Sequence, residues 1–308
     1  MRTVCPTTRM PFPIGARLSL VLTYDGGTRH RGKGPVMTPL GRHSAPQPTH
    51  SIEGETPGLN VAVFDPDSPA ALPPVFLIHG FGSSVELNWV KTGWVAALTR
   101  AGRRVLSVDL PGHGRSSSPY DLDSYTPGKI RADLLQILID QGVRPLAAGD
   151  PTSGVDLIGY SLGSRLAWEF GATQPELVRR MVLGGPNPRD PLADFDLAAA
   201  QDFLNDGTPI ADASTAWLLN MAQVVPSNDI FALLALIQAV KLEPFDPTDA
   251  VPKMPILLVA GDQDERAKSM TLLAELSGRA QSHVLPGRTH ESAVTSREFK
   301  EAAIAFLA

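Results

Sequence analysis

Short apolar runs alternate with longer segments of helical periodicity over most of this chain. The runs have the length of buried strands and occur at 75–78, 105–108, 155–158, 181–183 and 256–259, with further strand patterns at 59–64 and 282–285. Apolar residues recur at helical spacing in 89–100, 127–141, 164–174, 268–276 and 296–306. This alternation predicts the α/β class, with a parallel sheet covered by helices on both faces.

One long segment, residues 186–252, departs from that rhythm. Its apolar positions follow a helical pattern in three stretches, 198–204, 214–224 and 229–240, with no strand pattern between them. The simplest interpretation is a helical insertion between two strands of the sheet.

The first fifty residues are rich in Pro, Gly, Thr and Arg and have no sustained periodicity, which predicts a disordered leader at 1–50 and a folded domain at 51–308. They carry seven Arg and Lys against one acid, Asp25. Met37 is an alternative start of translation, so whether residues 1–36 are translated stays open.

Charge and composition exclude several classes of function. Beyond residue 50 the net charge is −11, which argues against nucleic acid as a partner. Apolar runs stay below the 18 or so residues that span a membrane, and the stretch 14–24 is interrupted by Arg17. Cys5 is the single cysteine, so no disulfide forms within the chain. We expect a cytoplasmic protein; its association with further copies of itself stays open.

A possible nucleophile lies between a strand pattern and a helix pattern. The sequence Gly159-Tyr160-Ser161-Leu162-Gly163 follows the run 155–158 and precedes the helical stretch 164–174. In this context GxSxG is typical of a nucleophile elbow, in which the glycines remove the Cβ atoms that would collide with the sharp turn. We therefore expect Ser161 to be the nucleophile, with Gly159 and Gly163 supporting the elbow.

A serine hydroxyl needs a base, and the base needs an orienting acid. His290 follows the last strand pattern, and Asp262 and Asp264 follow the strand that ends near Gly261. The order Ser, Asp, His matches this type of sheet. Asp262 is more typical of a turn-bracing residue, because aspartates bond their own backbone in turns, but from the residues alone it remains an alternative to Asp264.

Backbone N–H groups must also stabilise the oxyanion of the intermediate. The residue after the nucleophile, Leu162, is expected to supply one. Phe81, flanked by Gly80 and Gly82 at the end of the strand 75–78, is expected to supply the other. His79 is expected to support this loop by hydrogen bonds.

Together, these motifs resemble the α/β-hydrolase superfamily from about residue 57 to the end. They are Leu77-Ile78-His79-Gly80-Phe81-Gly82, Asp109-Leu110-Pro111-Gly112-His113-Gly114-Arg115-Ser116, the elbow, Gly261-Asp262-Gln263-Asp264 and Gly287-Arg288-Thr289-His290. The resemblance implies an eight-stranded, mostly parallel sheet with residues 186–252 as a cap over the site. It also implies Asp264 as the acid and a structural role for Asp109. Ser164, where a third glycine is common, is a departure.

Two motifs distinguish this chain from several enzyme groups of the superfamily that it resembles. The elbow carries serine, whereas epoxide hydrolases and haloalkane dehalogenases have aspartate there. The loop 80–84 is also unlike that of proline iminopeptidases or of carbon–carbon bond hydrolases.

The expected cap, residues 186–252, holds ten acids against two basic residues, Arg189 and Lys241. The apolar residues there, Phe195, Phe203, Trp217, Met221, Phe231 and Phe245, either roof a pocket or hold the cap helices together.

Two other site types fit the pattern poorly. Val85 occupies the third glycine position of a dinucleotide-binding loop, and no histidine stands at 294 to complete a helical zinc motif with His290.

We therefore expect a hydrolase that cleaves esters of small to medium apolar acyl groups through an acyl-enzyme, without metal or cofactor. Lactonase, perhydrolase-like and carbon–carbon bond hydrolase activities are alternatives, as is a ligand-binding receptor that retains the triad.

Overall fold

The computed structural model of this 308-residue chain describes residues 47–53, 58–190, 192–265 and 270–308. The predicted leader, residues 1–50, lies outside the described residues except for its last four. The described residues belong to the unit formed by residues 44–308.

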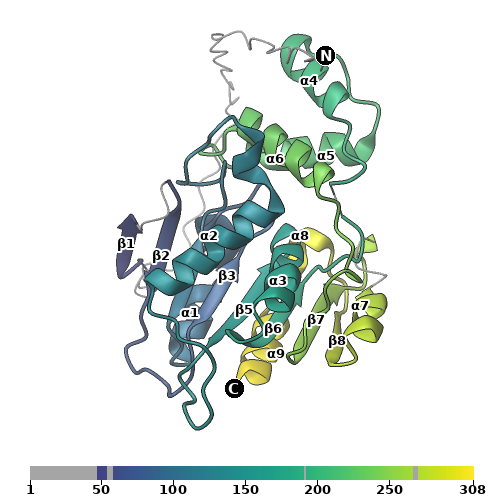
Figure 1. Cartoon of the computed structure of the whole chain (residues 1–308). Helices are drawn as coiled ribbons and strands as arrows, with labels where there is room; N and C mark the ends of the chain where they lie inside the picture. Colours follow the sequence, from purple (N-terminus) through teal and green to yellow (C-terminus); the bar gives the residue numbers. More distant parts are fainter. Residues whose placement is uncertain (1–46, 54–57, 191, 266–269) are drawn as a thin grey trace, which may run out of the picture. The chain divides into compact units, whose positions relative to one another are not determined.

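The unit is built on one eight-stranded sheet (Figure 1). Its strands, in spatial order, are β1 (His50–Glu53), β2 (Asn60–Phe64), β4 (Val105–Val108), β3 (Val75–Ile78), β5 (Val155–Tyr160), β6 (Val178–Gly184), β7 (Ile256–Gly261) and β8 (Ala280–Leu285). Strands β1, β2 and β4 pair antiparallel, and every other pair is parallel. The predicted mostly parallel, eight-stranded sheet is confirmed.

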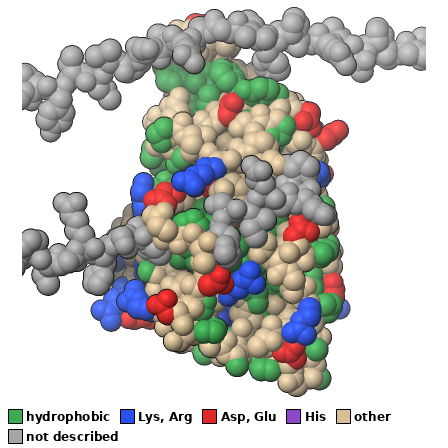
Figure 2. Space-filling model, turned by 90° about the vertical axis from the view of Figure 1, so that its left-hand side faces the viewer, with side chains coloured by type: hydrophobic (Ala, Val, Ile, Leu, Met, Phe, Trp, Pro, Cys, Tyr) green, Lys and Arg blue, Asp and Glu red, His purple; other side chains and the backbone are tan. Residues whose placement is uncertain are grey.

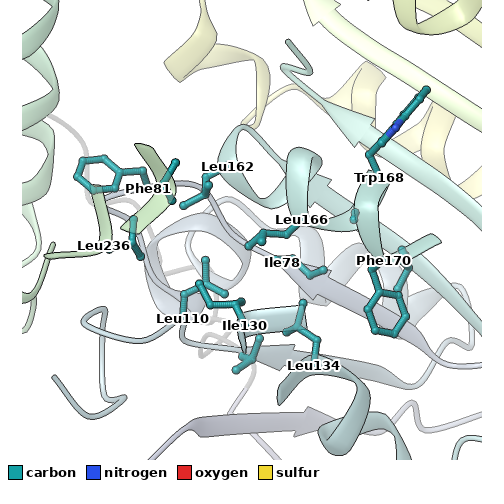
Figure 3. Close-up of a cluster of buried hydrophobic side chains, with 14 of the residues drawn as sticks. Ile78, Phe81, Leu110, Ile130, Leu134, Leu162, Leu166, Trp168, Phe170 and Leu236 are labelled. Carbon is teal, nitrogen blue, oxygen red and sulfur yellow. The ribbon is translucent and has the colours of Figure 1, made fainter. Parts of the chain in front are cut away.

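Helices cover both faces of the sheet, as predicted. One apolar cluster joins the sheet to α2 (Pro127–Asp140), α3 (Leu162–Thr173) and α7 (Met270–Ser277). The other joins it to α1 (Trp94–Arg100), α8 (His290–Ala293) and α9 (Arg297–Leu307). Figure 3 shows part of the first cluster, where Ile78 of β3 lies among Leu134 of α2 and Leu166 of α3. Burial of the strands on both faces explains why their sequences are almost continuously apolar.

Two helix starts follow the expected local rules. Thr126 caps α2, because its hydroxyl accepts a hydrogen bond from Lys129 N and Pro127 occupies the first turn. The predicted helix 89–100, in contrast, is two elements: a π-helical turn η1 (Glu86–Val90), then α1 from Trp94. Gly93 separates them with a φ of 82°, in the left-handed region, where a helix does not continue.

The strand before the elbow carries one buried carboxylate that the apolar pattern does not reveal. Asp156 of β5 is fully buried and pairs with Arg103 at 2.5 Å and Arg179 at 2.6 Å. Both guanidinium groups also donate to the carbonyl oxygen of Leu307 near the chain end. Each of the three charged groups thus has a partner, and these contacts tie β5 to the C-terminal helix α9.

Three helices lie between β6 and β7, within the segment 186–252: α4 (Leu197–Asp206), α5 (Ala213–Val224) and α6 (Ile230–Leu242). Each begins at an aspartate N-cap, namely Asp196, Asp212 and Asp229. The buried Arg165 of α3 contacts both ends of the insertion, pairing with Asp190 and donating to the carbonyl of Glu243. The three apolar stretches of the sequence therefore correspond to three helices anchored on α3.

The surface is mixed in charge. On the face shown in Figure 2, Lys and Arg side chains are interspersed with Asp and Glu, and no broad basic surface is visible there. Among the described helices, none is both long enough and apolar enough to traverse a bilayer.

Candidate active site

Ser161 stands at the turn from β5 into α3, in a conformation that few residues adopt. Its φ is 54° and its ψ −115°, and it is the one non-glycine residue with positive φ in the described part of the chain. Such backbone geometry is strained and tends to persist where the surrounding structure fixes it. Here Ser161 N donates to Gly184 O at 2.9 Å, and Ser164 N donates back to Ser161 O at 2.8 Å.

The glycines of the elbow are required by close packing. A Cβ on Gly159 would lie 2.3 Å from Gly163 O, and one on Gly163 would lie 2.0 Å from Ile78 O. Ser164, the departure from the usual pattern, is accommodated because its hydroxyl reaches the carbonyl oxygens of Gly159 and Gly184, at 3.0 and 2.8 Å. The elbow thus tolerates serine at 164 but no side chain at 159 or 163.

The structure brings His290 and Asp264 together. His290 begins α8, directly after the cap residue Thr289, and its Nδ1 lies 2.6 Å from Asp264 Oδ2. The aspartate side chain is 1% exposed and the histidine side chain 11%. A carboxylate accepting from Nδ1–H leaves Nε2 as the ring atom that can take a proton.

Asp262, the alternative acid, lies elsewhere. Its side chain is exposed, and Oδ1 accepts a hydrogen bond from Gly287 N at 2.8 Å. It thereby braces the turn after β7, as expected from the habit of aspartate in turns.

A glycine that the sequence did not single out makes room for the histidine. Gly185 follows β6 with a φ of 56°, and a Cβ there would lie 2.7 Å from His290 Cε1. The sequence contains a signal, since Gly184, Gly185 and Pro186 end a strand together, but this pattern marks a tight turn without indicating what packs against it.

The predicted oxyanion loop packs against the elbow. A Cβ on Gly80 would lie 3.2 Å from Ser161 Cβ, so the loop that carries Phe81 and the serine are in direct contact. Leu162 is the first residue of α3, where backbone N–H groups have no partner within the helix. The two amides predicted to bind the oxyanion therefore belong to segments that adjoin Ser161.

Two buried histidines hold this loop. His79 Nδ1–H donates to Gly80 O at 2.8 Å, and its Nε2 accepts from Leu110 N at 3.0 Å. His113, which the sequence placed only in a structural motif, donates from Nδ1 to Pro111 O at 2.9 Å and accepts at Nε2 from Gly82 N at 3.0 Å. Both rings act as donor and acceptor at once and are therefore neutral.

Asp109 supports the same loop from its other end. Its carboxylate accepts from Val85 N at 2.7 Å, Asn60 Nδ2 at 2.9 Å and Arg115 N at 3.0 Å. This hydrogen bonding accounts for the Asp109 motif without any role in chemistry.

The two neutral histidines make stability sensitive to acid. Burial lowers the pKa of His79 to about 4 and that of His113 to about 3, the latter also through the neighbouring His79 ring. The unfolded chain binds both protons near pH 6.5, so it holds more protons than the folded chain below that pH. We expect the unfolding free energy, measured with urea, to fall by roughly 2 to 4 kcal/mol between pH 7.5 and 5.

A His113→Gln variant is the control for this pH effect. Glutamine retains an acceptor for Gly82 N but does not titrate, so the loss of stability over the same interval should be about half that of the wild type. An equal loss in both proteins would show that His113 does not titrate on unfolding.

A cavity of about 310 Å³ opens onto Ser161 and His290. Its base includes Gly80, Phe81 and Tyr160. One wall belongs to the insertion and its start, and is apolar: Leu192, Trp217, Leu218, Met221 and Val224. The other combines η1 and the residues on either side of it with α8 and the residues after it: Ser83, Leu87, Asn88, Thr92, Glu291, Val294 and Thr295.

Of the aromatic residues and the methionine singled out in the insertion, few reach this cavity. Trp217 and Met221 line it, whereas Phe195 is buried in the core and Phe203 and Phe231 are exposed. Phe245 packs under the Arg165 guanidinium, 5.5 Å from its carbon. The insertion thus uses some of its apolar residues to form a wall and the rest to hold itself together.

This chain is similar in sequence to a family model and to several curated proteins. A family model described as alpha/beta hydrolase fold matches residues 73–221. A putative 2-succinyl-6-hydroxy-2,4-cyclohexadiene-1-carboxylate synthase of Bacillus subtilis is 30% identical over 42% of this chain, and Epoxide hydrolase B of Mycobacterium tuberculosis is 27% identical over 61%. The chain spans about half the length of these curated relatives, 42% and 57% respectively.

Solved structures agree on the fold. A structure from a study of carboxylesterases of Nitrososphaera gargenis has a TM-score of 0.63 at 16% identity, covering 84% of this chain and 97% of the other. Epoxide Hydrolase A of Mycobacterium thermoresistibile has a TM-score of 0.62 at 19% identity, covering 85% and 98%. The residues that the structure describes contain no cluster of three or more His, Cys, Asp or Glu side chains placed to hold a metal ion.

Proposed function

We propose that this chain, which belongs to the α/β-hydrolase superfamily, is a serine hydrolase that cleaves carboxylic esters through an acyl-enzyme. One observation carries the proposal: His290, whose Nδ1 lies 2.6 Å from Asp264 Oδ2, lines the same cavity as Ser161 on its strained turn. A nucleophile, a base and an orienting acid in that relation are what serine catalysis requires.

The proposed reaction has two halves. His290, oriented by Asp264, takes the proton of Ser161 as the serine oxygen attacks the ester carbonyl, and the amides of Phe81 and Leu162 bind the oxyanion. The imidazolium then protonates the departing alcohol. Water, deprotonated by the same histidine, attacks the acyl-enzyme and releases the acid and Ser161.

The cavity favours uncharged, apolar substrates. The insertion contributes aliphatic and aromatic side chains to its lining, and the acidic Glu291 also lines it. A volume of about 310 Å³ suits a small to medium acyl group. An anionic substrate would meet the carboxylate of Glu291, and we expect such esters to be poor substrates.

Epoxide hydrolysis, the activity in the names of some relatives, does not fit a serine nucleophile. Attack by Ser161 on an epoxide would form an ether, which lacks a carbonyl carbon for water to attack, so turnover would stop after one event. An ester or lactone carbonyl yields an acyl-enzyme that water does hydrolyse. Serine at the elbow therefore favours acyl transfer. Lactones, peracid formation and carbon–carbon bonds next to a carbonyl remain within the reach of this chemistry.

The test is a panel of p-nitrophenyl esters of increasing acyl length, with lactones, amides and styrene oxide alongside. We expect hydrolysis of neutral esters, a loss of rate when a carboxylate is added to the acyl chain, and no turnover of the epoxide. Covalent labelling by a fluorophosphonate probe should accompany the activity. A protein that takes up the probe but turns over no carbonyl substrate would instead behave as a receptor.

A further inference from the structure

Asn88 is a buried polar side chain in the wall of the catalytic cavity. It is 6% exposed and lines the cavity, and its Nδ2 has no hydrogen-bond partner among the described residues. In the described part of the chain, three buried side-chain nitrogen atoms have no hydrogen-bond partner. Of the three residues that carry them, Asn88 is the one that lines the cavity. Because a buried amide without a partner is unfavourable, an amide placed here points to a partner that arrives with the substrate.

The backbone around Asn88 presents the side chain in a fixed place. Asn88 is the third residue of the π-helical turn η1, which is closed by a hydrogen bond from Lys91 N to Glu86 O at 2.9 Å. π-Helical turns of this kind are frequent at functional sites. The neighbouring Trp89 is fully buried with its ring 5.8 Å from that of Trp94, so the turn rests on a rigid core.

Except for the hydroxyl of Ser83, the other polar side chains of this wall are already engaged. Thr92 Oγ1 donates to Asn88 O at 2.6 Å, and Trp94 Nε1 donates to Val294 O at 2.8 Å, which joins η1 and α1 to the segment after α8. Thr289 Oγ1 donates to the Glu291 carboxylate at 2.7 Å. Asn88 is therefore the side chain of this wall with an amide N–H left to donate.

The two walls differ in what they can bind. The insertion wall, with Leu192, Trp217 and Met221, suits a hydrocarbon chain. The wall with Asn88 suits a single oxygen, and rotation of the amide about χ2 turns either its donor or its acceptor towards the cavity. Glu291 also lies in that wall, and its carboxylate would repel an anion. The substrate oxygen that this wall accommodates is therefore uncharged.

We propose that Asn88 is a specificity-determining residue that donates a hydrogen bond to a second, uncharged oxygen of the substrate. The preferred substrate is then an ester that carries an ether, keto or hydroxyl oxygen on one of its chains, in addition to the scissile carboxyl group. Its hydrocarbon part lies on the insertion wall and its extra oxygen on η1. This inference rests on the proposed ester hydrolysis.

The test is a cycle of substrate and enzyme changes that cancels intrinsic reactivity. Hydrolysis of p-nitrophenyl pentanoate is compared with that of its 3-oxa and 4-oxa analogues, and hydrolysis of butyl butyrate with that of 2-methoxyethyl butyrate, by the wild type and by Asn88→Leu. For at least one pair, the ratio of kcat/KM for the oxygen-bearing ester to that for the plain ester should fall about 10- to 100-fold in the variant.

Two further measurements separate this role from a structural one. Asn88→Leu removes an unpaired amide, so its unfolding free energy should equal or exceed that of the wild type. Asn88→Ala is a second variant for the selectivity ratio, with a smaller side chain. Thr173→Val, outside the cavity, should leave the selectivity ratio unchanged. Ratios that stay constant in both Asn88 variants for every pair would overturn the inference while leaving ester hydrolysis intact. If no ester is hydrolysed by the wild type, the proposed function itself fails.

Discussion

Replacing Ser161 with alanine is expected to abolish covalent labelling by a fluorophosphonate probe and to lower ester hydrolysis by about 10⁴-fold or more. The hydroxyl oxygen is the atom that bonds to the acyl group in the proposed reaction, and no neighbouring group replaces it. Alanine keeps the Cβ that contacts the Gly80 loop, so the fold should be retained. Labelling followed by mass spectrometry, with p-nitrophenyl ester kinetics, measures both effects.

Ser164→Ala is the matched control for this prediction. Its hydroxyl lies in the same elbow but donates to the carbonyl oxygens of Gly159 and Gly184, away from the cavity. The control should keep its labelling and lose stability by about 1 kcal/mol for the missing hydrogen bonds. Labelling that persists in Ser161→Ala would refute the assignment of the nucleophile.

Much of this fold was predictable because its signals are local. The buried parallel strands are mostly apolar on both faces, so the runs at 75–78, 155–158 and 256–259 stand out in the sequence, Asp156 being the exception among them. The short apolar stretches of the insertion became α4, α5 and α6 because each starts at an aspartate cap. The motifs at strand ends could be placed at one edge of the sheet, since parallel strands bring their carboxyl ends together.

What the sequence did not indicate depends on contacts between distant segments. His113 supports the predicted oxyanion loop across a separation of 31 residues, and Gly185 makes room for a histidine more than a hundred residues later. The unpaired amide of Asn88 is visible only once its neighbours are known. The break at Gly93 was missed because a helical pattern of apolar residues continues through it.

The choice between two aspartates shows the same limit. From the residues, both Asp262 and Asp264 follow β7 and either could orient the base; the resemblance to a family favoured Asp264. In the structure the side chain of Asp264 is buried against His290, and that of Asp262 is exposed and bonded to Gly287 N. The difference arises from the turn after β7, which points successive side chains in different directions.

Asp264→Asn should therefore lower kcat/KM for ester hydrolysis by about 10³- to 10⁴-fold, and Asp262→Asn by less than about threefold. An asparagine amide at 264 can donate to Nδ1 of His290, which favours the tautomer whose Nε2 carries the proton and cannot accept one from Ser161. Asp262→Asn keeps an oxygen that accepts from Gly287 N, so the turn is retained. Both variants should bind a non-hydrolysable ester analogue like the wild type. If Asp262→Asn caused the larger loss, Asp262 would be the acid that orients His290 during catalysis.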